Sequence, residues 1–97
     1  MGDKHDDGKL RFDLVPDNAE AAIVAVLTFG AAKYGAWNWC TVPNARARYF
    51  AAARRHLAAW RMGETNDSES GLPHLAHSAV CLMFLVEFDR LPAELQP

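Results

Sequence analysis

Residues 73–90 read PHLAHSAVCLMFLVEFDR, and every residue from Ala79 to Val86 is apolar. Pro73 suits the first position of a helix and Pro92 ends the pattern, so a helix is predicted over 73–90. A helix that is apolar on every side must be buried on every side. Two other helices and an arm are too little to cover it. We therefore expect a homo-oligomer, a dimer or a tetramer, to complete the core.

Two further helical segments precede this one. The spacing of apolar residues predicts helices from about Asp17 to Tyr34 and from about Asn44 to Met62. Each begins with an N-cap residue type, and Gly35 and Gly63 follow the last turns as helix stops. The predicted fold class is therefore all-α, with a helical bundle over residues 17–97.

Residues 1–16 form a different kind of segment. Glycines, a proline and a cluster of acids disfavour a helix there. The apolar residues Leu10, Phe12 and Leu14 alternate with polar ones, and this period of two is typical of an extended chain. We predict an extended N-terminal arm that lies on the rest of a single domain spanning residues 1–97.

Composition excludes several classes of function. The chain has 97 residues and a formal net charge of −2, which is not the charge of a generic basic nucleic-acid binder. Its apolar stretches are too short to span a bilayer, and its first residues are polar, so we expect no membrane segment and no secretory signal. Two cysteines do not make a disulfide scaffold, so a cytoplasmic setting is expected.

Charged residues are segregated along the chain. No Asp or Glu occurs between Ala21 and Gly63, a stretch that contains Lys33 and several arginines including Arg55. Acids resume at Glu64. A nucleotide bound through a divalent metal needs carboxylates for the cation and basic groups for the remaining phosphate charge. For any single arginine, a solvated helix face explains the pattern equally well.

Histidines and acids meet at the junction of the second and third predicted helices. His56 and Glu64 share one helix face by their spacing, and His74 and His77 share another. Antiparallel packing would gather six polar groups around one cavity: His56, Glu64, Asp67, Glu69, His74 and His77. Such a set suits manganese, cobalt or zinc better than magnesium. Taken singly, each histidine is more often a hydrogen-bonded structural residue, and a helix N-terminus there can also receive phosphate.

The loop after the first predicted helix is rich in aromatic residues. Residues 29–39 read FGAAKYGAWNW, so Trp37 and Trp39 flank Asn38. A flat aromatic ring can stack on a base, and an asparagine can hydrogen-bond a purine edge. The alternative is that the two tryptophans close the bottom of a small core and that Asn38 is a turn residue.

Together these segments resemble the dATP/dGTP diphosphohydrolase family of phages and some bacteria, which is related to MazG-type nucleotide pyrophosphohydrolases and includes MazZ-like members. The resemblance rests on DGKLRFDLVP (7–16), FG (29–30), KYG (33–35), NW (38–39), RH (55–56), GE (63–64) and HLAH (74–77), with Trp60, Asp67 and Glu69 between them. It implies a MazG-like helical bundle, a homo-oligomer and divalent metal, either Mn, Co or Mg. It also implies hydrolysis of dGTP or dATP to monophosphate and pyrophosphate, in some members for 2-aminoadenine phage DNA in the host cytoplasm.

The resemblance and the helix spacing together give a set of expected roles. Typical MazG proteins carry Glu-x-x-Glu and Glu-x-x-Asp, whereas this chain has His74-x-x-His77, so the ligands are not transferred from that motif. We expect metal ligands at Glu64, Asp67, His74 and His77, and catalytic groups at His56 and Glu69. Substrate contacts are expected at Lys9, Arg11, Lys33, Asn38, Trp39 and Arg55. The alternatives are a non-catalytic helical oligomerisation module and a nucleotidase that releases single phosphates.

Overall fold

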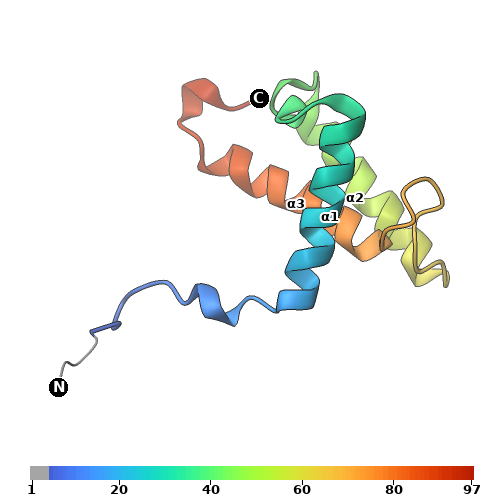
Figure 1. The fold of residues 1–97 in the computed structure, drawn as a ribbon. Helices are drawn as coiled ribbons and strands as arrows, with labels where there is room; N and C mark the ends of the chain where they lie inside the picture. Colours follow the sequence, from blue (N-terminus) through green and yellow to red (C-terminus); the bar gives the residue numbers. More distant parts are fainter. Residues whose placement is uncertain (1–4) are drawn as a thin grey trace.

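The computed structural model describes residues 5–97, and these residues form three α-helices without a β-strand (Figure 1). The helices are α1 (Asp17–Tyr34), α2 (Ala45–Arg61) and α3 (His74–Arg90), with short 3₁₀ turns at Phe12–Leu14, Asn38–Thr41 and Ala93–Leu95. The predicted all-α class is confirmed, and each helix boundary lies within one residue of its predicted position. None of the helices in residues 5–97 is long and apolar enough to cross a membrane.

The helix ends differ from the prediction in detail. Pro16 occupies the N-cap position of α1, so Asp17 is its first helical residue and the expected side-chain cap is absent from this helix. Pro73 likewise precedes α3 instead of opening it. The predicted stops Gly35 and Gly63 have φ angles of 97° and 102°, a region that favours glycine.

The core lies where α3 packs against α1 and α2. Ser78 donates a hydrogen bond of 2.7 Å to the carbonyl oxygen of Ala53, while His74 meets His56 further along, so α2 and α3 run antiparallel. Phe88 is only 2% exposed and is the largest fully buried side chain. The buried cluster comprises Val26, Ala45, Ala76, Val80, Phe84 and Phe88.

The N-terminal arm does not lie on the helices, which corrects that expectation. Figure 1 shows it leading away from the bundle, and it contains a 3₁₀ turn at Phe12–Leu14. Leu10 is 82% exposed, and Phe12 and Leu14 are also exposed. The arm joins α1 at the end of that helix away from the point where α1 crosses α3 (Figure 1). Residues 1–4 of the expected arm lie outside the described residues.

One face of α3 stays uncovered in the single chain. Val86 is 61% exposed, and Leu82 and Met83 on the same helix are also exposed. The all-round burial expected from the sequence is therefore not reached by α1 and α2 alone. Completion of this core by further copies of the chain remains a prediction.

Candidate functional site

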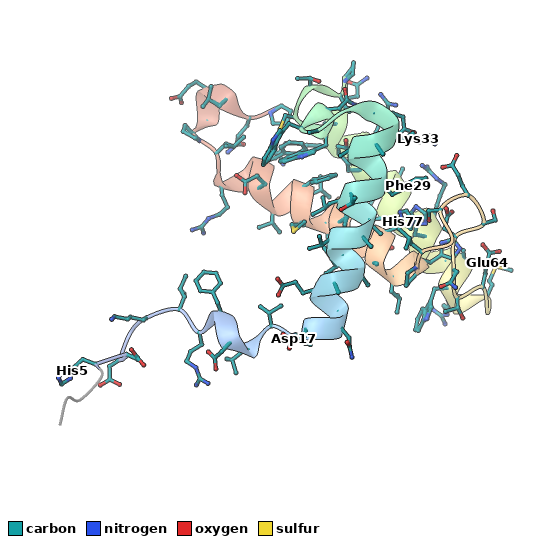
Figure 2. All side chains as sticks on the ribbon, in the orientation of Figure 1. His5, Asp17, Phe29, Lys33, Glu64 and His77 are labelled. Atoms are coloured by element: carbon teal, nitrogen blue, oxygen red, sulfur yellow. The ribbon has the colours of Figure 1, made fainter. Side chains whose placement is uncertain are left out.

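A groove of about 870 Å³ runs between α1, the aromatic loop that follows it (residues 35–39), α2 and α3. At one end it is lined by His56 and His77, and at the other by Trp39 and Phe84. His77 and Phe84 are seven positions apart on α3, so the two ends are separated by about two helical turns, roughly 10 Å. Figure 2 shows Lys33 on α1, together with His77 and Glu64 nearer the loop between α2 and α3.

His74 is the centre of the polar cluster at one end of this groove. It is 4% exposed, and both nitrogens of its ring have partners. Nε2 lies 2.6 Å from Oε1 of Glu64, and Nδ1 lies 2.8 Å from Nδ1 of His56. Because a carboxylate accepts hydrogen bonds, Nε2 of His74 donates to Glu64, and Nδ1 is the ring nitrogen that faces His56.

His77 adds a second imidazole beside His56. The two rings are stacked, with centroids 4.5 Å apart and an angle of 10° between their planes. Nε2 of His77 lies 2.7 Å from Oγ of Ser70 and 4.0 Å from Oδ2 of Asp67. Ser70 and Asp67 approach the same nitrogen, so the three residues do not form a serine–histidine–aspartate triad.

The electrostatics of the cluster favour neutral imidazoles beside an ionised carboxylate. Burial lowers the pKa of His56, and the neighbouring His77 and His74 lower it further. Burial also lowers the pKa of His77. Hydrogen bonds from Ser70, whose backbone nitrogen lies 2.9 Å from Oδ2, lower the pKa of Asp67. These are the protonation states in which histidine and aspartate bind metal ions.

Three of these residues can hold one cation. His56, Asp67 and His74 each offer a ligand atom, and these atoms lie within 4.8 Å of one another. Glu64 contacts the far nitrogen of His74, which is the usual place of a carboxylate that orients a histidine ligand. Of the four expected metal ligands, the structure therefore gathers Asp67 and His74 with His56. It places Glu64 behind His74 and His77 against Ser70.

Basic groups line the side of the groove. Nζ of Lys33 lies 2.8 Å from both carboxylate oxygens of Glu69, so this pair joins α1 to the loop between α2 and α3. The same ammonium group lies 5.0 Å from the centre of the Tyr34 ring. Arg55 on α2 also lines the groove. Lys33, Arg55 and Glu69 therefore all line the same groove.

The aromatic end contains one residue that the expected site did not include. Trp39 stacks on Phe84 with centroids 4.3 Å apart and an angle of 4° between the planes. Asn38 lines the groove beside it. Trp37, left out of the expected site, also lines the groove and is 73% exposed. Its place next to Asn38 was the available signal, but sequence alone does not tell which tryptophan enters the core.

Lys9 and Arg11 are not brought to the groove. Both lie on the arm, which leads away from the bundle (Figure 1). Arg11 is exposed and forms an ion pair of 2.8 Å with Asp13.

A second hollow, of about 590 Å³, lies along α1 and is lined by Asp17 and Glu20. Two carboxylates at its edge repel an anionic ligand. The larger groove, with its basic side, is the better match to a nucleotide.

Comparison with known proteins identifies the family of this chain. The family model described as dATP/dGTP diphosphohydrolase, N-terminal, matches residues 1–96. A protein of Salmonella phage PMBT28 named dATP/dGTP diphosphohydrolase is 34% identical over 84 residues. That alignment covers 87% of this chain and 28% of the relative, so the chain spans little more than a quarter of that protein's length. No solved structure matches significantly. The chain therefore belongs to the family of dATP/dGTP diphosphohydrolase N-terminal domains.

Proposed function

We propose that this chain binds and hydrolyses purine deoxynucleoside triphosphates, dGTP or dATP, giving the monophosphate and pyrophosphate. The name of the phage relative supports the reaction. The observation that carries the proposal is a groove lined by His56 and Asp67 at one end, with the buried His74 in contact with His56, and by aromatic rings at the other end. The triphosphate would bind at the end with the metal-ligating residues, and the purine would bind at the aromatic end. In phages with 2-aminoadenine DNA, the dGMP product would supply synthesis of the modified purine.

The donor set fits a divalent cation. Two imidazoles and one carboxylate suit manganese or cobalt better than magnesium, which prefers oxygen ligands and water. His56, Asp67 and His74 would hold the ion, and Glu64 would orient His74 through its Nε2–H. When bound, such an ion lowers the pKa of a water molecule and neutralises phosphate charge.

The remaining groove residues have separate tasks. Lys33 and Arg55 bind the phosphate oxygens, and the triphosphate takes the place of Glu69 beside Lys33. The freed Glu69 carboxylate accepts a proton from the attacking water. The water oxygen bonds to the α-phosphorus as the bond to the leaving pyrophosphate breaks. His77, held by Ser70, keeps the ring of His56 in place by stacking on it.

The test is a product assay with purified protein. Incubation with dGTP and Mn²⁺ or Co²⁺ should yield dGMP and pyrophosphate in equal amounts by ion-exchange chromatography, and EDTA should abolish both. Release of inorganic phosphate with dGDP would instead indicate a nucleotidase. Absence of any product with each metal would contradict the proposal.

A non-catalytic oligomerisation module is the second candidate. The observation in its favour is the uncovered apolar face of α3, which includes Leu82 and Val86. A self-associating protein that gives no product from dGTP would support it. We also propose self-association for the enzyme, since this face is exposed in either case.

A further inference from the structure

We propose that the purine base stacks on the ring of Trp37, and that Trp39 supports Trp37 from the side of the core. This inference rests on the proposed function, because it assigns the base-binding part of the same groove. It departs from the expectation that Trp39 itself reads the base. The two tryptophans are two positions apart, but their surroundings differ.

Trp39 is committed to the core. Phe84 covers one face of its indole in a nearly parallel stack, and the Phe88 ring lies 5.7 Å away at an angle of 42°. A ring that packs on two aromatic side chains of α3 has its position fixed and has only its other face to offer a ligand. Its role is to support what packs on its outer side.

Trp37 has the opposite environment. Its ring centre lies 6.1 Å from that of Trp39, while 73% of the residue is exposed and borders the groove. Its φ angle is 65°, in the left-handed region that bulky residues rarely adopt. Backbone strain of this kind clusters at ligand sites, where the structure keeps a side chain in an unfavourable but useful position. Here the left-handed backbone at Trp37 accompanies a large flat ring that is exposed to solvent beside the groove.

The length of the groove that Trp37 lines also agrees with that of a nucleotide. The aromatic end lies about two turns of α3, roughly 10 Å, from the histidine end, so one molecule can contact both. Asn38 is exposed next to Trp37 and can hydrogen-bond a base edge. Stacking strength increases with ring area, so a purine gains more from stacking on Trp37 than a pyrimidine.

The experiment compares Trp37→Ala and Trp37→Phe with Trp60→Ala, a matched change of an exposed tryptophan on α2 that does not line the groove. Trp37→Ala should raise KM for dGTP about tenfold, as expected for loss of one base stack, with kcat within about threefold. Trp37→Phe should restore most of the loss, and Trp60→Ala should resemble the wild type. Inhibition by inorganic tripolyphosphate, which has no base, should be unchanged in Trp37→Ala.

Two results would overturn the assignment. One is an unchanged KM for dGTP in Trp37→Ala. The other is an equal loss of dGTP and tripolyphosphate binding, which would make Trp37 a support of the phosphate end. A separate titration distinguishes this failure from failure of the proposed function: dGMP should quench the fluorescence of the wild type more strongly than that of Trp37→Phe. Such quenching in a protein that hydrolyses nothing would support base stacking on Trp37 and contradict the proposed reaction.

Discussion

At the residue scale, the activities of two variants can distinguish a metal ligand, Asp67, from a carboxylate that only orients a ligand, Glu64. Asp67→Asn should reduce dGTP hydrolysis at least a hundredfold, because it replaces the charged carboxylate in the cluster with His56 and His74 by a neutral amide. Glu64→Gln should cost about 10- to 100-fold, because it weakens only the orientation of His74. Release of dGMP is the measurement, and Glu94→Gln in the exposed C-terminal turn is the control. If Glu64→Gln lost more activity than Asp67→Asn, the two roles would be reversed.

The lowered pKa of His56 has a consequence for stability in the absence of metal. The unfolded chain binds a proton near the ordinary value of 6.5, whereas the folded protein binds it at lower pH. Stability from this residue is therefore complete above about pH 6.5 and is lost as the pH falls toward the folded-state pKa. Urea unfolding in EDTA should show a free energy of unfolding that decreases from about pH 7 to about pH 5.

His77 adds to this effect, since its pKa is lowered in the same direction. In the double variant His56→Gln with His77→Gln, the free energy of unfolding should depend less on pH over that range. A wild type whose stability rises on acidification would show that the imidazoles are charged in the folded protein.

The sequence predicts which residues form the cluster, but not which of their atoms contact one another. Helical spacing places His56 with Glu64 and His74 with His77 on common faces, and antiparallel packing joins them. Spacing does not specify rotamers, so it could not assign Nε2 of His74 to Glu64 or the Ser70 hydroxyl to His77. Those contacts depend on the path of the loop between α2 and α3.

At the element scale, the stability of α3 should depend on its buried face. Phe88→Ala should lower the free energy of unfolding by about 3–5 kcal/mol, because it leaves a cavity beside Trp39 and Tyr49. Leu95→Ala, at an exposed position after the helix, should change it by less than about 0.5 kcal/mol. Chemical denaturation followed by circular dichroism measures both values. Equal effects would mean that Phe88 is not in the core.

The elements themselves were the most predictable part of the molecule. Apolar periodicity and the glycine stops gave helix ends within one residue, because both are local properties of the chain. The caps were less predictable, since Pro16 takes the position that Asp17 was expected to fill. The arm could not be placed because a period of two describes only local geometry, not the surface on which a segment rests.

At the scale of the whole molecule, the uncovered face of α3 predicts self-association. Light scattering after size exclusion should give two or four times the 10.7 kDa mass of the chain. Val86→Glu should shift the protein toward the monomer, because a charge would be buried in the contact between subunits. Glu94→Lys, an exposed change in the C-terminal turn, should have little effect. A wild type with the mass of one chain would contradict this expectation.

The Lys33–Glu69 pair has a consequence for how the groove responds to its surroundings. Both side chains are well exposed, so dissolved salt screens their attraction. The same loop is held to α3 by short contacts that salt scarcely affects, including the 2.7 Å contact between Ser70 and His77 and the backbone bond from His74 to Thr65. Raising the ionic strength should therefore loosen α1 from the loop while the imidazole end keeps its shape.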